Sequence, residues 1–137
     1  MAWAASSRAI LAGIVLSVTV GLSPTVVRGA PSPGPAEDAA AGEVVFKKRC
    51  AACHAVAPGQ NRLGPTMAGV VGRKVGSTPG YKFSQAFKDG KIAWTPKNLD
   101  KFLANPRVVF PGTKMSLAGV SDPKDRTDLI RYLASLK

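Results

Sequence analysis

Histidine and cysteine are scarce in this chain, which has one histidine and two cysteines among its 137 residues. All three stand together as Cys50, Cys53 and His54 in the run C-A-A-C-H. A structural zinc site needs four ligands, and only carboxylates could complete this set, which is an uncommon combination. A thioredoxin-like dithiol needs a βαβ setting, which the Gly- and Pro-rich sequence after His54 does not resemble. The shortage of ligands therefore disfavours a zinc site, and the sequence context disfavours a redox dithiol.

The C-A-A-C-H run has the form of a covalent haem attachment site. Cysteines three positions apart share one face of a helical turn, so both thiols can meet the two vinyl groups of one macrocycle, with His54 directed at the iron. A domain of about 95 residues is only marginally stable unaided, so an internal staple such as a metal or a large apolar cofactor is expected. The sequence therefore predicts one haem, held through Cys50, Cys53 and His54.

Charge is missing from residues 9–27, an apolar run that follows Arg8. This pattern is typical of an export signal, but the run is also long enough to cross a bilayer as a helix. We expect residues 1–30 to be a signal peptide or an N-terminal membrane anchor, residues 31–41 a Pro/Ala-rich linker, and residues 42–137 the haem domain.

Cleavage of the signal is the favoured interpretation, although no good cleavage site follows the apolar run. Arg28-Gly29-Ala30 is a poor small-x-small site, and a better pair, Ala39 and Ala41, lies far downstream. A retained anchor with a short tether is therefore the alternative.

The haem domain reads as helical, and no strand pattern competes. A first helix is predicted over residues 42–53, a short one over residues 84–88, and one over residues 95–104 that starts at Thr95-Pro96 and ends before Pro106. Asp122-Pro123 opens a last helix, whose apolar residues have helical spacing. Residues 57–80 are rich in Gly and Pro, which predicts a long irregular loop that wraps something.

The sixth iron ligand has several candidates, because no second histidine is present: Met, Lys, Tyr or water. Met67 is near His54 in sequence, which favours packing on the same side of the haem or in the core. Met115 follows Pro111-Gly112 in a loop between two helices and is free to approach the other face. Spacing alone favours Met115 and leaves core packing open for it.

Several motifs occur in the order typical of one family, namely C-A-A-C-H, L-G-P-T-M, G-R-K-V-G, P-G-Y-K-F-S, Trp94, P-G-T-K-M and R-T-D-L-I-R-Y-L. The chain resembles class I c-type cytochromes of the mitochondrial-like, soluble bacterial type. The resemblance covers residues 42–137 and implies the all-α cytochrome c fold, with three main helices, short helices and long loops wrapped around one covalently bound haem c.

The resemblance also implies roles for particular residues. His54 and Met115 would be the axial iron ligands, and the Pro65 carbonyl would accept the His54 imidazole proton. Residues that hydrogen-bond or neutralise the haem propionates would be Arg73, Ser84, Trp94 and Thr113. The first and last helices would meet through Gly42, Phe46, Leu129 and Tyr132.

Three residues depart from the mitochondrial pattern. The family usually has Tyr, Asn and Tyr where this chain has Phe83, Phe87 and Phe102. This chain therefore lacks three polar groups that in the family lie near the propionates, near an internal water and near the methionine sulfur. We expect a drier haem pocket and a reduction potential that responds to Phe102→Tyr.

Acidic residues are also few, 8 against 19 Lys and Arg, which gives a formal net charge of +11. Such an excess favours acidic partners. Nucleic acid is disfavoured, because the chain has an export signal and no basic motif interleaved with aromatics. The resemblance implies docking to acidic faces of redox proteins through basic residues around the haem edge: Arg49, Arg62, Arg107 and Lys114.

The resemblance implies a monomeric electron carrier, not an enzyme. It would work in the periplasm, with a tether to the outer face of the inner membrane if the anchor is kept. Its partners would be a quinol-oxidising cytochrome complex and a terminal oxidase or reductase, with electrons passing by outer-sphere transfer. The alternatives are an anchored cytochrome serving one fixed partner, and a haem enzyme with an open iron site. The enzyme is disfavoured because His54 is used as a ligand and no other imidazole remains for proton transfer.

Overall fold

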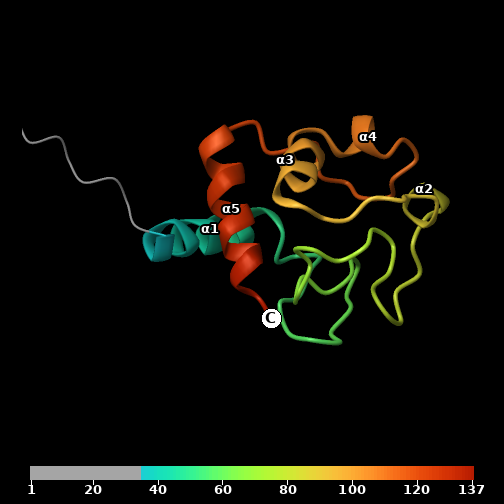
Figure 1. Cartoon of the computed structure of the whole chain (residues 1–137), viewed down its shortest axis with the longest axis horizontal. Coiled ribbons are helices and arrows are strands. Elements are labelled where there is room, and N and C mark those ends of the chain that lie inside the picture. Colours follow the sequence, from blue (N-terminus) through green and yellow to red (C-terminus); the bar gives the residue numbers. More distant parts are fainter. Residues whose placement is uncertain (1–34) are drawn as a thin grey trace, which may run out of the picture. The chain divides into compact units, whose positions relative to one another are not determined.

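The structure is a computed structural model that describes residues 35–137 (Figure 1). The expected signal peptide or anchor, residues 1–30, lies outside the described residues. Among the described residues no helix is long and apolar enough to cross a bilayer, and none forms a strand beyond an isolated bridge between Lys74 and Ala93. The helices are α1 (Pro35–Arg49), α2 (Gln85–Lys88), α3 (Pro96–Ala104), α4 (Pro106–Val109) and α5 (Pro123–Ser135). The prediction of an all-α fold with three main helices and short ones is confirmed.

Two helices begin where local sequence predicts. Thr95 Oγ1 accepts a hydrogen bond from the Asn98 backbone amide at 3.2 Å, and a proline follows it as the first residue of α3. Asp122 Oδ1 caps α5 by accepting from the amides of Lys124 at 2.6 Å and Asp125 at 3.1 Å. A cap of this kind satisfies amides that the helix itself leaves unpaired.

Two helix boundaries differ from the predictions. The first helix begins at Pro35 instead of position 42, so much of the segment expected to be a linker is helical. Alanine-rich sequence favours a helix, and the Asp38 carboxylate near its start pairs with Arg131 of α5. The chain also turns back into a helix at Pro106, because the Asn105 side chain accepts from the Val108 amide at 3.3 Å and caps α4.

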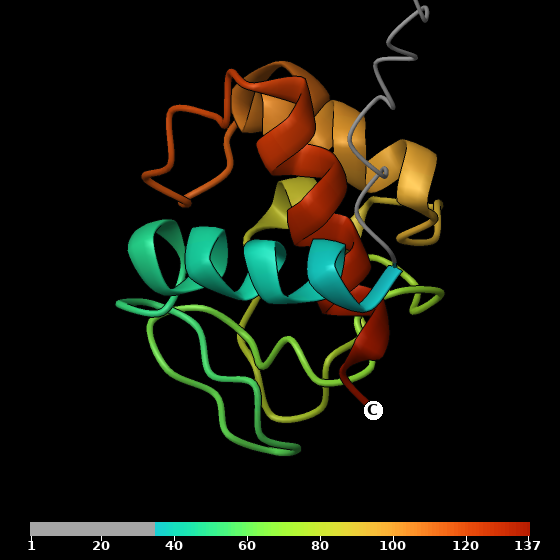
Figure 2. The ribbon, with the colours of Figure 1, turned by 90° about the vertical axis from the view of Figure 1, so that its left-hand side faces the viewer.

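Helices α1 and α5 cross in close contact (Figure 2). A β-carbon added at Gly42 would lie 2.0 Å from the Asp128 carbonyl oxygen and 2.8 Å from Tyr132 Cβ. Phe46 and Tyr132 pack with ring centroids 5.6 Å apart, and Leu129 is fully buried. The expected contact between the first and last helices is therefore present, and it depends on a glycine inside α1.

The segment between α1 and α2 is irregular, and it is drawn in green and yellow in Figure 1. It is attached to the C-terminus by a hydrogen bond from the Gly69 amide to the Leu136 carbonyl at 3.1 Å. Its buried residues, among them Val70 and Val75, join the core formed by Leu99, Leu103 and Leu133. The helices and this segment together surround a cavity.

Candidate functional site

The cavity has a volume of about 650 Å³ and a mainly apolar wall. It is large enough for a cofactor of haem size. All nine residues predicted to touch or tune the haem line it: Cys50, Cys53, His54, Pro65, Arg73, Ser84, Trp94, Thr113 and Met115.

The C-A-A-C-H run continues α1 as a tight turn. The Cys50 amide donates to the Phe46 carbonyl at 2.8 Å, and the His54 amide donates to the Cys50 carbonyl at 2.9 Å. Burial raises the pKa of the Cys50 thiol to about 11, against a smaller opposing effect of the Arg49 charge. Both thiols are unpaired with each other and reach the same cavity, as attachment to one macrocycle requires.

His54 is held by the segment that follows it. Its Nδ1 lies 2.8 Å from the Pro65 carbonyl oxygen, the bond expected from the family pattern. Because a carbonyl only accepts, Nδ1 carries the proton and Nε2 keeps the lone pair that a metal needs. Burial lowers the pKa of the imidazole, and the bond to Pro65 opposes this in part. His54 is therefore set up as a neutral ligand.

Both candidate methionines line the cavity, but from different segments. Met67 is tied to the segment around His54, because its amide donates to the Ala55 carbonyl at 2.9 Å. Met115 comes from the loop between α4 and α5, where its amide donates to Thr113 Oγ1 at 3.2 Å. Met67 is therefore held to the segment that follows His54, whereas Met115 reaches the cavity from a separate loop that Thr113 helps to hold.

One polar atom tests whether the wall fits haem. Ser84 Oγ is buried without a hydrogen-bond partner among the described residues, which is costly unless a ligand supplies an acceptor. A haem propionate is such an acceptor. Arg73 adds positive charge at this wall: two of its guanidinium nitrogens donate to the Ala68 and Thr66 carbonyls at 2.9 Å. The residues present therefore fit haem c.

The rest of this wall is aromatic. Phe102 packs 4.9 Å from Trp94 and edge-on to Phe87 at 5.8 Å, and Phe87 stacks on Phe110 at 4.7 Å. Of the three residues that depart from the family pattern, Phe87 and Phe102 line the cavity, and Phe83 packs behind Phe87 at 5.9 Å without lining it. Two of the three phenylalanines therefore add apolar surface to the cavity, and the expectation that Phe83 does so as well is not met.

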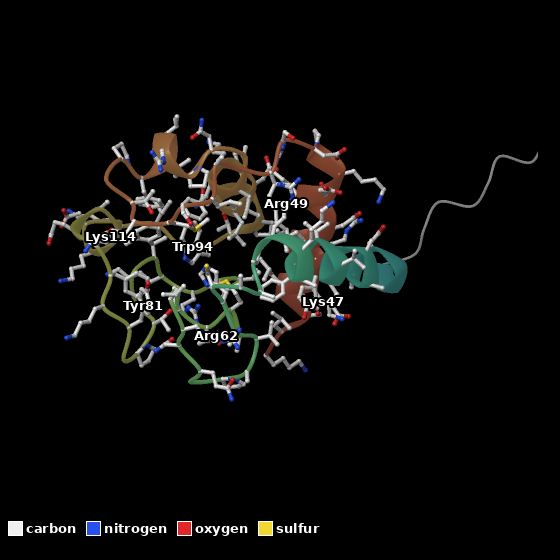
Figure 3. The ribbon with its side chains drawn as sticks, turned by 180° about the vertical axis from the view of Figure 1, so that it is seen from behind. Lys47, Arg49, Arg62, Tyr81, Trp94 and Lys114 are labelled. Carbon is white, nitrogen blue, oxygen red and sulfur yellow. The ribbon has the colours of Figure 1, made fainter. Side chains whose placement is uncertain are left out.

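Basic residues lie around the cavity. Arg49 and Lys114 line it, Arg62 is exposed next to the lining residue Leu63, and Arg107 is exposed on α4 but does not line it. Figure 3 shows Arg49, Arg62 and Lys114 spread around Trp94, which lies inside. Of the four expected docking residues, Arg49 and Lys114 therefore line the cavity and Arg62 adjoins a lining residue, whereas Arg107 does neither.

Sequence reasoning missed several further lining residues, including residues 116–118, which directly follow Met115. Leu63, Tyr81 and Lys82 were also missed, although they belong to the same motifs that supplied Pro65 and Ser84. Tyr81 connects the two motifs, since its hydroxyl donates to the Leu63 carbonyl at 2.6 Å.

The chain is similar to several known proteins. The cytochrome c family model matches residues 39–137. A cytochrome c from Euglena viridis is 45% identical over 100 residues, covering 73% of this chain and 98% of the relative. A cytochrome c2 from Rhodomicrobium vannielii is 46% identical over 101 residues, covering 73% of this chain and 80% of the relative. The solved structure of cytochrome cH from Methylobacterium extorquens shares 46% identity with a TM-score of 0.67, covering 72% of this chain and 98% of that one.

Proposed function

The chain belongs to the cytochrome c family, and we propose that it passes electrons between membrane-bound or periplasmic redox complexes by outer-sphere transfer. Members of this family are electron carriers and not enzymes, and they bind haem c covalently, as this chain does. The observation that carries the proposal is one apolar cavity lined by Cys50, Cys53, His54 and Met115, with basic residues around it.

The bound haem would supply an iron centre that changes oxidation state by one electron. Cys50 and Cys53 would hold it through thioether bonds, and His54 and Met115 would be the ligands of its iron. With both ligands supplied by the protein, an electron can be exchanged without binding a substrate or exchanging ligands. Met115 presents a soft sulfur that favours Fe(II), which suits a carrier of positive potential.

The other wall residues would orient and shield the haem. Pro65 fixes the His54 ring through the bond to Nδ1. Ser84, Arg73, Trp94 and Thr113 would hold the propionates, because buried carboxylates need donors or a counter-charge. The aromatic wall would shield the iron from water.

Spectra of the purified holoprotein test this arrangement. A low-spin reduced c-type spectrum is expected, together with a methionine–iron charge-transfer band in the oxidised protein that is lost in Met115→Ala and kept in Met67→Leu. High-spin iron that readily binds peroxide would instead support the haem enzyme with an open site.

The partners we propose are acidic faces of redox proteins, such as a quinol-oxidising cytochrome complex and a terminal oxidase or reductase. The charges support this proposal. Ion pairs among the described residues engage Lys47, Lys124, Arg126 and Arg131, and leave Arg49, Arg62 and Lys114 without an acidic partner. Electron transfer to an acidic partner should slow steeply as salt is added. A rate independent of salt would reject this mode of docking.

We further propose that the protein is exported and that processing, where it occurs, leaves Asp38 in place. Cleavage at Ala41 would remove the Asp38 carboxylate that pairs with Arg131 and would cut α1 just before Gly42. Intact-mass measurement of periplasmic and membrane fractions tests this. A mature chain that starts after Asp38 would contradict it, and a full-length chain in the membrane fraction would identify the anchored alternative.

A further inference from the structure

The loop that supplies Met115, residues 110–121, is held by hydrogen bonds only near its two ends. At the first end the Phe110 amide donates to the Pro106 carbonyl at 2.9 Å. Among the described residues no hydrogen bond joins residues 111–118 to another element, since the bond that the Met115 amide makes stays within the loop. A segment held in this way can open without unfolding of the whole domain, so the bonds at its second end decide how often it does.

The second end of the loop lies against the C-terminal end of α3, which the chain passes on its way to α5 (Figure 1). Val120 is fully buried, and its amide donates to the Leu103 carbonyl at 2.8 Å. At Gly119 an added β-carbon would lie 2.3 Å from the Ala104 carbonyl oxygen, and φ there is +135°. The loop therefore ends in a close contact with α3 that leaves no room for a side chain at position 119.

One arginine of α5 ties this end of the loop to both helices. Arg126 Nη1 donates to the carbonyls of Val120 at 3.0 Å and Ser121 at 2.9 Å. Its Nε donates to Asp100 Oδ1 on α3 at 2.7 Å. The arginine side chain is 13% exposed, so little water can replace these bonds, and bonds from a charged donor are stronger than neutral ones.

We propose that Arg126, oriented by Asp100, is a positioning residue for Met115: it keeps the loop closed and thereby sets how tightly the methionine is held on the haem iron. This inference rests on the proposed function. Loss of the arginine would leave two backbone carbonyls and one carboxylate without their donor. The loop would then open more easily, while the crossing of α1 and α5 would stay as it is.

Imidazole added to the oxidised holoprotein probes this opening, because it can bind the iron only where Met115 has left it. Loss of the methionine–iron charge-transfer band during the titration measures the binding. Arg126→Gln should bind imidazole about ten-fold more tightly than the parent, as expected for the loss of charge-assisted hydrogen bonds. Asp100→Asn should bind it about three-fold more tightly, because the arginine keeps its bonds to the two carbonyls. The Asp100 carboxylate is 47% exposed, so this second variant should fold even where Arg126→Gln does not.

Two other cations of α5 provide matched controls. Lys124→Gln removes a positive charge from the same end of the helix, but the Lys124 ammonium group pairs with Asp128 and not with the loop. Arg131→Gln weakens the pair with Asp38 on α1 and should lower the stability of the domain as a whole. Both variants should bind imidazole like the parent.

Hydrogen exchange of backbone amides measures the same opening without an added ligand. The Val120 amide should exchange about ten-fold faster in Arg126→Gln than in the parent. The Val75 amide, which donates to the Ile92 carbonyl at 2.9 Å, should exchange as in the parent.

Parent-like imidazole binding by both Arg126→Gln and Asp100→Asn would overturn the inference. So would an equal gain of affinity in Arg131→Gln, which would trace the effect to the stability of the whole domain. In either case the charge-transfer band of the parent would leave the proposed function in place. A parent that lacks this band would instead reject Met115 as a ligand, and with it both the proposed function and the inference.

Discussion

A β-carbon added at Gly64 would lie 2.1 Å from Cε1 of the His54 ring. Glycine at this position therefore lets the chain pass against the imidazole, and the carbonyl oxygen of the next residue, Pro65, accepts a hydrogen bond from His54 Nδ1 at 2.8 Å. The position of the ring and the strength of its donation to a metal are thus both set by two adjacent residues.

Gly64→Ala should displace the ring and weaken its bond to Pro65. We expect a loss of about 1–3 kcal/mol in the free energy of unfolding of the holoprotein, as for an overpacked core. The reduction potential should rise, because a weaker imidazole donor stabilises Fe(III) less. Denaturant unfolding and redox titration measure the two effects.

Gly59→Ala is the control for Gly64→Ala. Gly59 has a φ of +72° with open space around its Cα, so alanine there costs about 1 kcal/mol of backbone strain without touching His54. An equal shift of potential in both variants would show that the contact with His54 is not the cause.

Acid should destabilise the folded protein through His54. Burial lowers the pKa of the unligated imidazole below the ordinary 6.5, and in the holoprotein the iron would compete with the proton for the same nitrogen. An unfolded chain that has released His54 therefore binds the proton more readily than the folded one. This contribution to stability is complete above pH 6.5 and decreases as the pH falls below it. Unfolding midpoints of the holoprotein from neutral to mildly acidic pH should therefore decline before the carboxylates titrate near about 4. Since the chain has one histidine, midpoints that stay constant or rise over this interval would contradict the assignment.

Gly42→Ala tests the crossing of α1 and α5. Helix propensity alone would make alanine more stable by about 1 kcal/mol. The added carbon would instead meet the Asp128 carbonyl, which is backbone and cannot turn away. We expect a net loss of about 1–3 kcal/mol, measured by denaturant unfolding. Val44→Ala, on the exposed face of the same helix, should change stability by less than about 0.5 kcal/mol, and a more stable Gly42→Ala would refute the close contact.

Arg131 interacts with two buried carboxylates, one on α1 and one on α5. Asp38 and Asp128 side chains are only 8% and 5% exposed, and Arg131 pairs with the first and lies 3.9 Å from the second. Arg131→Gln should cost about 2 kcal/mol, less than for a fully buried pair because the arginine is half-exposed.

The exposed pair Glu43–Lys47, 2.7 Å apart, provides the comparison for Arg131. Lys47→Gln should cost no more than about 0.5 kcal/mol. Equal losses in the two variants would mean that burial of the carboxylates has no energetic consequence.

Local sequence predicted the features that local chemistry determines. The turn at Cys50 to His54 and the capped starts at Thr95 and Asp122 each depend on a few adjacent residues, and each is present. The start of α1 could not be predicted in this way, because Asp38 is stabilised by Arg131, which lies 93 residues away. The place of Leu63 on the cavity involves a bond to Tyr81, 18 residues further along the chain, and its position in the L-G-P-T-M motif did not by itself identify it as a lining residue.

Phe102→Tyr tests whether the aromatic wall of the cavity affects the reduction potential of the haem. Phe102 is 6% exposed and enclosed by Phe87, Trp94 and Phe110, so a hydroxyl added there enters an apolar region. Without a hydrogen-bond partner it should cost about 1–3 kcal/mol of stability. It should also shift the reduction potential, since polarity near the iron changes the relative stability of its two charge states. Phe83→Tyr is the matched control, because Phe83 does not line the cavity and should leave the potential nearly unchanged. Identical redox titrations of Phe102→Tyr and the parent would show that the aromatic wall shields the haem without tuning it.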